Sequence, residues 1–446
     1  MRIEREFLQD IIKEATTVSA TKAEVFALYS KTLNIEVKDQ DVENLDVSES
    51  TGYAVRVIKD SRPGFAYSTE PERYKEVVKE AIKTAGLTSE DPFCDIPPPA
   101  EIKGVKTFDK NISSLNQERA IQLVMEIERA ALGSDKRVKR VRKAGGTFTE
   151  SEIYIVNTEG INSSFKATSC TAHITVAAEE AGQAQMGWGY QGSRRLSDID
   201  FSEVGKEAAQ RAVSLLGAKK AKTCKAQIIL DPAVASEFLS VLSSSFSADN
   251  VQKGKSLLMN RLDKRVFSDR VNIIDNALLE YHLGSRPFDA EGVASRRNVL
   301  VKEGILTGYL HNLYTAKKGN TSSTANATRA GIFSPPSVGV SNLYIEASSE
   351  EYTYSLEELI KEVSQGILVT EAMGVHTANP ITGEFSFGIT GLWIEKGEIL
   401  YPVKEAALSG NMLELFSRVV GVGKDIRFYG KIGSPHLLIE EGDVSA

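Results

Sequence analysis

Short, beta-prone segments punctuated by glycine dominate the chain from about Asn298 to its end. Such segments must pair with one another to satisfy their backbone groups, so a long series of them predicts a domain built on sheets. Helical patterns interrupt this region near Leu356–Val363 and Asn411–Val419. The chain before it alternates helical and strand patterns. This order predicts the α+β class, with an N-terminal mixed alpha/beta region followed by a beta-rich C-terminal domain.

Two connectors divide the 446 residues, a length that suggests two or three domains. Pro97-Pro98-Pro99 suits neither a helix nor a strand and is typical of a stiff connector. The polar link Lys219–Lys225 precedes a short strand at 226–230 and a helix that Asp231-Pro232 begins. We therefore expect an N-terminal α+β subdomain at 1–99, a middle α+β subdomain at 100–222 and a C-terminal beta-rich domain at 223–446.

Helical periodicity recurs in the first half of the chain. The predicted helices are Phe7–Thr16, one that ends at Gly86, one from a Ser114–Gln117 capping box to Gly133, and one at about 201–216. Beta-prone runs lie between them, at 23–28, 52–58, 152–156, 163–168 and 171–177.

Two glycine–aromatic turns suggest an internal repeat. Gly64-Phe65-Ala66-Tyr67 precedes Val77-Val78-Lys79-Glu80-Ala81, and Gly187-Trp188-Gly189-Tyr190 precedes Val204-Gly205-Lys206-Glu207-Ala208. Both read as strand, aromatic turn and helix, although the spacings differ by several residues. A duplicated unit and chance reuse of such turns both remain open.

The charge pattern argues against nucleic acid as the main ligand. The 53 basic and 60 acidic residues give a net charge of −7, which mostly favours solubility. The strongest basic run is Lys136–Lys143, with only Phe148 nearby to stack on a base. Such a run is typical of a solvated edge strand, where lysine and arginine discourage unwanted pairing, and a nucleic-acid patch is the alternative.

Histidine and cysteine are scarce, so metal or nucleophile chemistry must draw on few residues. The five histidines are His173, His282, His311, His376 and His436, and the three cysteines are Cys94, Cys170 and Cys224. The histidines never fall at zinc-ligand spacing on one helix, and the cysteines form no C-x-x-C pair. The sequence also has no G-x-S-x-G elbow, and Gly421–Asp425 lacks the spacing of a phosphate loop.

The same cysteine usage predicts a reducing compartment. The charged start of the sequence does not have the apolar core of a signal peptide, and no run of about 18 apolar residues occurs. We expect a cytoplasmic protein without a membrane partner.

Two polar loops are candidate binding sites. Thr321–Arg329 is small and polar and ends in a guanidinium that can fix a carboxylate or a carbonyl. Gly374–Gly388 combines turn residues with His376, Asn379 and Glu384. Loops of this kind on a beta scaffold are common binding sites and are also common as plain hairpin connections.

Several separated motifs resemble the TldD/PmbA family, in the order expected for it. They are His376–Gly388, Trp393–Ile399, Gly410–Leu415, Ala325–Arg329 and Ile432–Pro435. The resemblance extends loosely over nearly the whole chain. It implies an N-terminal α+β region, a beta-rich C-terminal region and a peptidase assembly that acts on unfolded or small peptides.

The family has two branches, and this chain resembles the PmbA (TldE) branch, which lacks a zinc motif. TldD-type chains carry an H-E-x-x-x-H helix and a later cysteine ligand. At the corresponding place this chain has Ser236, Glu237 and Val241, and its last cysteine is Cys224. A single carboxylate cannot replace the three protein ligands of a catalytic zinc ion. The resemblance therefore implies no metal in this chain, with Glu237 as a remnant of the motif.

The resemblance implies a subunit without its own metal site that pairs with a zinc-holding TldD-type homologue, or with itself as a homodimer. We expect a peptide to pair with a sheet edge and to contact Asn326, Arg329, His376, Asn379 and Glu384. Two alternatives remain open. One is a self-sufficient hydrolase with Glu237 as general base and His376 nearby, and the other is a DNA gyrase-associated modulator.

Overall fold

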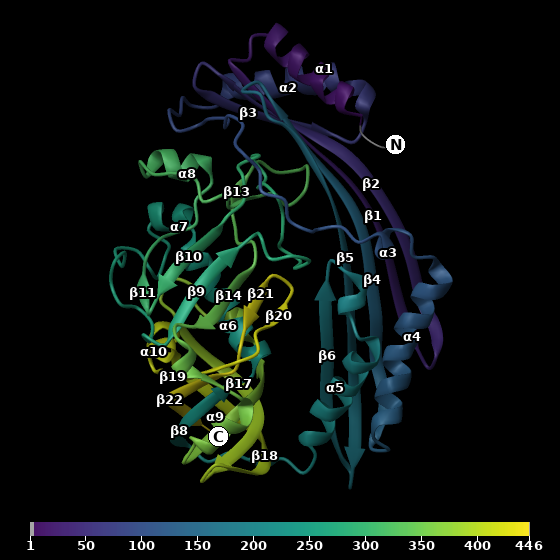
Figure 1. Ribbon diagram of the computed structural model, residues 1–446, viewed down its shortest axis with the longest axis vertical. Coiled ribbons are helices and arrows are strands. Elements are labelled where there is room, and N and C mark those ends of the chain that lie inside the picture. Colours follow the sequence, from purple (N-terminus) through teal and green to yellow (C-terminus); the bar gives the residue numbers. More distant parts are fainter. Residues whose placement is uncertain (1–3, 446) are drawn as a thin grey trace.

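A long, curved sheet forms one side of the computed structural model, which describes residues 4–445 (Figure 1). Its strand order is β3-β2-β1-β4-β5-β6, and all neighbours are antiparallel. The strands are β1 (Lys22–Lys38), β2 (Asp41–Lys59), β3 (Arg62–Ser68), β4 (Val138–Asn157), β5 (Asn162–Glu180) and β6 (Gln183–Ser193). The expected segments 1–99 and 100–222 each supply three strands, and the β1–β4 ladder joins them.

Two copies of one helix–strand–strand–strand–helix unit build this sheet. The first copy runs from α1 (Arg5–Thr17) through β1–β3 to α2 (Tyr74–Leu87), and the second from α4 (Gln117–Ser134) through β4–β6 to α5 (Phe201–Ser214). Gly64 lies against α2 and Gly187 lies against α5. A Cβ atom would sit 2.0 Å from the Ala81 oxygen at the first glycine and 2.2 Å from the Ala208 oxygen at the second. This equivalence favours a duplicated unit over chance reuse of the turn.

The helices cover one face of the sheet in two groups. Figure 1 shows α1 and α2 near the end where the chain begins, and α4 and α5 along the other half. Apolar residues of α1 and α2, including Leu8, Ile11 and Val78, form one buried cluster with β1–β3. Apolar residues of α4 and α5, including Ile127 and Val204, form a second cluster with β4 and β5. The opposite face is therefore left to contact the rest of the chain.

Two local predictions need correction. The side chain of Asn116, and not that of Ser114, caps α4 by accepting a hydrogen bond from the backbone nitrogen of Arg119. The predicted strands at 152–156, 163–168 and 171–177 are parts of two long strands, β4 and β5. Long strands are possible here because each residue from 144 to 156 pairs on both sides, with β1 and with β5.

The basic run Lys136–Lys143 lies at a local sheet edge. It leads into β4 beyond the end of β1, whose pairing with β4 reaches only Ala144, so this segment pairs with β5 alone. Acidic residues of neighbouring segments pair with several of its cations: Lys143 with Glu36 at 2.5 Å, and Arg137 with Glu180 at 3.5 Å. This arrangement fits the solvated edge strand.

The C-terminal part contains two larger sheets. One has the order β11-β10-β9-β14-β21-β20 and the other β15-β19-β22-β8-β16-β17-β18-β7. An additional pairing of β22 with β18 closes β22, β8, β16, β17 and β18 into a ring. The strands of the first sheet are β9 (Val271–Asn276), β10 (Arg297–Lys302), β11 (Ile305–Leu306), β14 (Leu343–Ala347), β20 (Arg427–Tyr429) and β21 (Ile432–Ser434). Those of the second are β7 (Lys219–Lys220), β8 (Cys224–Leu230), β15 (Thr353–Tyr354), β16 (Gln365–Met373), β17 (Glu384–Glu395), β18 (Glu398–Asn411), β19 (Val419–Gly423) and β22 (Leu437–Ser445).

The remaining elements are short. They include the pair β12 (Ala327–Thr328) and β13 (Ser337–Val338), and the helices α3 (Lys110–Ser113), α6 (Pro232–Ser243), α7 (Ala248–Gln252), α8 (Leu313–Lys318), α9 (Leu356–Lys361) and α10 (Met412–Ser417). The predicted helices near 356–363 and 411–419 are present as α9 and α10. The α+β class with a beta-rich C-terminal region is confirmed. No helix in the described part of the chain is long and apolar enough to cross a membrane.

Candidate functional site

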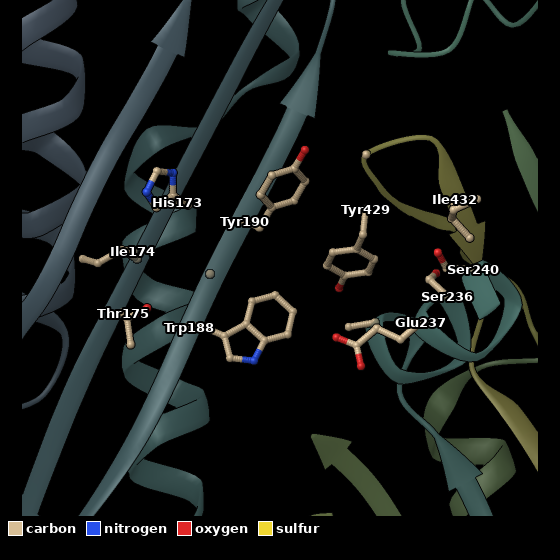
Figure 2. Close-up of a pocket in the computed structure, with 13 residues that line it drawn as sticks. His173, Ile174, Thr175, Trp188, Tyr190, Ser236, Glu237, Ser240, Tyr429 and Ile432 are labelled. Atoms are coloured by element: carbon tan, nitrogen blue, oxygen red, sulfur yellow. The ribbon is translucent and has the colours of Figure 1, made fainter. Parts of the chain in front are cut away.

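A cavity of about 520 Å³ lies between the long sheet and the C-terminal part (Figure 2). A volume of this size is typical of a small-molecule site. One wall comes from β5 and β6, and the other from α6 and the hairpin of β20 and β21. The lining residues are His173, Ile174, Thr175, Trp188, Gly189, Tyr190, Ala233, Ser236, Glu237, Ser240, Tyr429, Gly430 and Ile432.

Helix α6 brings a polar stripe to this cavity. Asp231 caps the helix by accepting a hydrogen bond from the backbone nitrogen of Ala233 at 3.0 Å, and Pro232 occupies the first turn. Phe238 and Leu242 face the C-terminal core, where both are almost fully buried. Their burial fixes the rotation of the helix and leaves Ser236, Glu237 and Ser240 along the cavity.

Glu237 is the carboxylate of the cavity. It remains accessible to solvent through the open cavity, and Figure 2 shows its carboxyl group directed toward the side of the cavity that carries Trp188. Partial burial, which disfavours the charged form, and the nearby carboxylate of Glu371 on β16 raise the pKa of Glu237 to about 7. Within residues 4–445, Glu237 has neither a hydrogen bond nor an ion pair. The group is therefore available to a ligand.

Two hydroxyl groups of the cavity also have no partner within the described part of the chain. They are the Oγ atom of Ser236 and the phenol of Tyr429. Ser236 is 2% exposed, and burial raises the pKa of Tyr429 well above its usual range. Buried polar atoms in native proteins nearly always make a hydrogen bond, so both groups need an explanation.

A balanced ion network holds the two walls together beside the cavity. Arg427 on β20 donates two hydrogen bonds to Glu207 on α5, at 2.8 and 2.9 Å. Arg211 on α5 contacts the same glutamate at 3.1 Å and Asp231 at 3.2 Å. The guanidinium of Arg211 also lies 4.6 Å from the ring centre of Trp188. Two arginines and two carboxylates thus neutralise one another.

The donor atoms of the cavity do not fit a catalytic zinc ion, which takes three protein ligands and a water molecule. Helix α6 offers one carboxylate, and His173 lies on the opposite wall, as Figure 2 shows. Over residues 4–445, no three histidine, cysteine, aspartate or glutamate side chains are placed to hold a metal ion.

The side chains of Asn326 and Arg329 are bonded to groups inside the protein and are not available to a ligand. Asn326 is fully buried, and its amide donates to Asp275 at 2.7 Å and to the Gly339 oxygen at 3.0 Å. Arg329 is paired with Glu24 of β1 at 2.6 Å. The carboxylate that this guanidinium fixes is therefore part of the same chain, and neither side chain is free to contact a peptide in this structure.

The second predicted loop is exposed but lies outside the cavity. The side chains of His376 and Glu384 are exposed to solvent. The side chain of Asn379 stabilises the loop by accepting hydrogen bonds from the backbone nitrogens of Ile381 and Thr382. None of the five predicted peptide-binding residues lines the cavity with Glu237. The structure therefore brings neither loop to the residue that the motif comparison singled out.

The aromatic residues that line the cavity were not predicted from the sequence. Trp188 and Tyr190 drew notice only as part of the repeated turn, and Tyr429 belongs to a three-residue strand that no pattern predicted. An aromatic–glycine–aromatic sequence on a strand puts both rings on one face, because side chains alternate across a sheet. That alternation was the available signal for Trp188 and Tyr190.

Comparison with known proteins matches the sequence to one family over nearly its whole length. It matches PmbA/TldA metallopeptidase domain 1 over residues 23–85, the central domain over 110–216 and the C-terminal domain over 223–446. The Metalloprotease PmbA of Escherichia coli O157:H7 is 30% identical, over 98% of this chain and 96% of that protein.

Two solved structures share the fold. A Thermotoga maritima protein, described provisionally as a modulator of a DNA gyrase, is 26% identical with a TM-score of 0.92, and the match covers 99% of each chain. TldE from Thermococcus kodakarensis is 22% identical with a TM-score of 0.89, over 99% of this chain and 100% of that one.

Proposed function

The chain belongs to the PmbA/TldA (TldD/PmbA) metallopeptidase family, and from this membership we propose that it is a PmbA/TldE-like subunit of a peptidase complex. In this proposal the zinc ion is held by a TldD-type homologue, and this chain completes the chamber in which unfolded or small peptides bind. Either a heterodimer or a larger assembly meets this description, and a homodimer is the state we expect without that homologue.

The observation that carries the proposal is the composition of α6. Ser236, Glu237 and Val241 stand where the TldD-type motif has its two histidines and its glutamate. Ser236 is buried and Val241 packs against the C-terminal core, so the helix is retained as a structural element. A helix of this kind with a single carboxylate supports a subunit that depends on a metal held elsewhere.

Peptide contacts in this proposal come from the exposed loop at 374–388. His376, Asn379 and Glu384 offer an imidazole, an amide and a carboxylate beside the start of β17. An extended peptide that pairs with a sheet edge is held mainly through its backbone, so many sequences are accepted. Asn326 and Arg329 hold their own loop in place through Asp275 and Glu24.

Three cysteines without disulfide partners support a reducing, cytoplasmic setting. They are Cys94, Cys170 and Cys224. We include this location in the proposal.

Purification of the chain alone and with an H-E-x-x-x-H homologue tests the proposal. We expect the isolated chain to bind no stoichiometric zinc and to leave an unfolded peptide intact. The pair is expected to co-purify and to cleave the peptide. Each chain by itself is the control. One tightly held zinc ion per isolated chain, or failure to associate with the homologue, contradicts the proposal.

A second candidate is a hydrolase that needs no partner, with Glu237 as general base. The raised pKa of Glu237, about 7, favours it because a general base works best when its pKa is near the operating pH. This candidate predicts peptide cleavage by the isolated chain that is lost on Glu237→Gln. Equal cleavage by both forms excludes it.

A further inference from the structure

We propose that the cavity beside α6 binds a primary ammonium group carried on an apolar body. Such a group occurs at the N-terminus of a peptide, on a lysine side chain and in a free alkyl or aryl amine. The inference concerns what the isolated chain binds, so it does not depend on the peptidase subunit proposed above. It rests on the charges, the unpaired acceptors and the walls of the cavity.

The fixed charges around the cavity leave an acidic excess. Arg211 and Arg427 are matched by Glu207 and Asp231, as the ion network shows. Glu237 has no cationic partner within residues 4–445, and it repels Glu371. A cation bound beside Glu237 relieves that repulsion, whereas an anion adds to it.

Histidine does not supply the missing cation. His173 is on the wall opposite α6, and burial lowers its pKa, so its ring is neutral at pH 7. Burial also lowers the pKa of His436, which lies near Arg211 and Asp231. The charged group that faces Glu237 from the neighbouring elements is therefore Glu371 of β16, and the already paired Arg211 of α5 lies near Glu371.

The unpaired groups match an ammonium group in number and kind. A primary ammonium has three N–H donors and no acceptor. The cavity offers the Glu237 carboxylate, the Ser236 hydroxyl and the Tyr429 hydroxyl as acceptors, none of which has a partner in residues 4–445. Figure 2 shows the Tyr429 hydroxyl directed toward Glu237. Each of these groups can accept a hydrogen bond from a bound ammonium.

The walls of the cavity suit the body that carries the ammonium. Trp188, Tyr190 and Ile432 provide apolar and aromatic surface, and Trp188 lies edge-on to Tyr429 with ring centres 5.8 Å apart. Aromatic rings attract cations through their faces and accept apolar groups by contact. The volume of about 520 Å³ leaves room for a side chain beyond the charged group.

Calorimetric titration with three matched probes tests this proposal. The probes are phenethylammonium chloride, 2-phenylethanol and 3-phenylpropionate, which share one ring and differ in the charge of the end group. We expect the ammonium probe to bind at least about tenfold more tightly than the alcohol, with no measurable binding of the anion. Equal binding of the alcohol, tighter binding of the anion, or no binding of the amine at millimolar concentrations overturns the proposal.

Three variants tie the binding to the named groups. Glu237→Gln should lose the preference for the amine over the alcohol, and Tyr429→Phe should weaken amine binding severalfold while keeping the ring. Glu357→Gln removes one exposed carboxylate on α9 and should leave binding unchanged. Thermal unfolding of each variant verifies that it is folded. Unchanged amine binding in Glu237→Gln overturns the proposal.

Two further probes identify the carrier of the ammonium group. Phe-Gly-Gly amide, compared with its N-acetylated form, tests for a peptide N-terminus. Nα-acetyl-lysine amide tests for a lysine side chain. The carrier that binds wild-type protein and loses binding on Glu237→Gln is the source of the ligand.

Discussion

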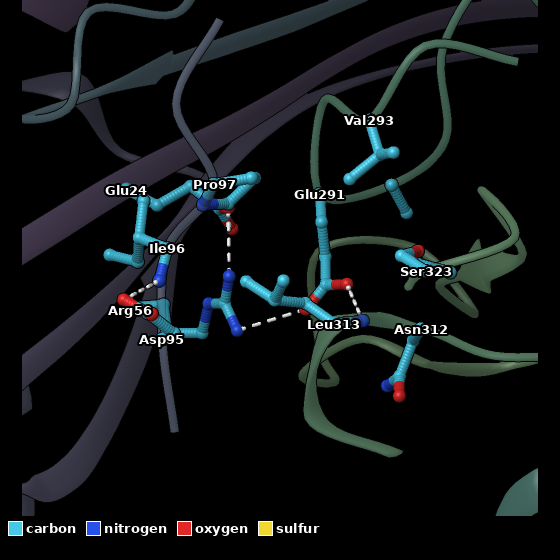
Figure 3. Close-up of polar contacts among 12 residues, drawn as sticks. Glu24, Arg56, Asp95, Ile96, Pro97, Glu291, Val293, Asn312, Leu313 and Ser323 are labelled. Carbon is cyan, nitrogen blue, oxygen red and sulfur yellow. Dashed lines mark hydrogen bonds and ion pairs between the residues drawn. The ribbon is translucent and has the colours of Figure 1, made fainter. Parts of the chain in front are cut away.

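The Nη2 atom of Arg329 lies 2.6 Å from the Oε1 atom of Glu24, although the two residues are 305 positions apart in the chain. Arg329 is 2% exposed and Glu24 is fully buried. The same glutamate accepts a hydrogen bond from Arg56 at 2.9 Å, and Arg56 contacts Glu291 at 3.2 Å (Figure 3). These four buried charges join the long sheet to the C-terminal part.

Removal of one charge from this group should destabilise the protein strongly. Glu24→Gln leaves the guanidinium of Arg329 buried without its counter-charge, at an expected cost of about 3–5 kcal/mol in the free energy of unfolding. Urea unfolding of the variant and its parent measures this difference. Arg297→Gln is the control, because Arg297 and Glu346 form an exposed pair whose loss should cost at most about 1 kcal/mol. Equal effects of the two changes would contradict the expectation.

Local patterns predicted much of this fold. The helix that Asp231-Pro232 begins and the helix ending near Gly86 are present, and the repeated turn corresponds to a repeated unit. These features depend on neighbours along the chain. The cavity depends on distant segments instead, because β5 and β6 form one wall and α6 with the β20–β21 hairpin forms the other. No periodicity in one segment contains that information.

The predicted loops illustrate the same limit for side chains. The polar loop Thr321–Arg329 was expected to bind a ligand, yet Asn326 and Arg329 are buried, with Asp275 and Glu24 as their hydrogen-bonding partners. The partners lie 51 and 305 residues away. Glu237 could be singled out because the resemblance supplied its position, whereas its neighbour Tyr429 carried no comparable signal.

The repeated glycines should not tolerate a side chain. In Gly64→Ala and Gly187→Ala the new Cβ atom meets helix backbone at 2.0 and 2.2 Å, which forces α2 or α5 away from the sheet. We expect each change to cost about 1–3 kcal/mol or more, measured by urea unfolding. Gly86→Ala is the matched control: its Cβ atom meets nothing within 4 Å, and alanine in a helix should add about 0.5–1 kcal/mol. A neutral effect of Gly187→Ala would argue against the close contact.

The basic run should not bind DNA under physiological salt. Arg137, Arg140 and Lys143 already have acidic neighbours in Asp135, Glu179 and Glu36, and the net charge is −7. We expect no saturable binding of a labelled 30-base-pair duplex below about 100 μM protein at 150 mM salt, measured by fluorescence anisotropy. Tight binding that Arg140→Glu abolishes would instead support the gyrase-associated alternative.

Glu237 should make the protein less stable as the pH rises. Its pKa in the folded chain is about 7, against an ordinary value of 4.5. Between these values the folded chain holds the proton more tightly than the unfolded chain does, so stability falls as the pH rises from about 4.5 to about 7 and then levels off. Glu237→Gln removes this dependence.

We therefore expect Glu237→Gln to be more stable than its parent at pH 8 and equal to it below about pH 4.5. The gain should be about 1 kcal/mol, because solvent reaches the carboxylate and screens part of the effect. Urea unfolding at pH 4.5, 6 and 8 measures it, with Ser240→Ala on the same helix as the control. A constant difference across the three pH values would mean that the pKa of Glu237 is the same in the folded and unfolded chains. A partly buried carboxylate beside Glu371 would then need a compensating positive charge to keep its ordinary pKa.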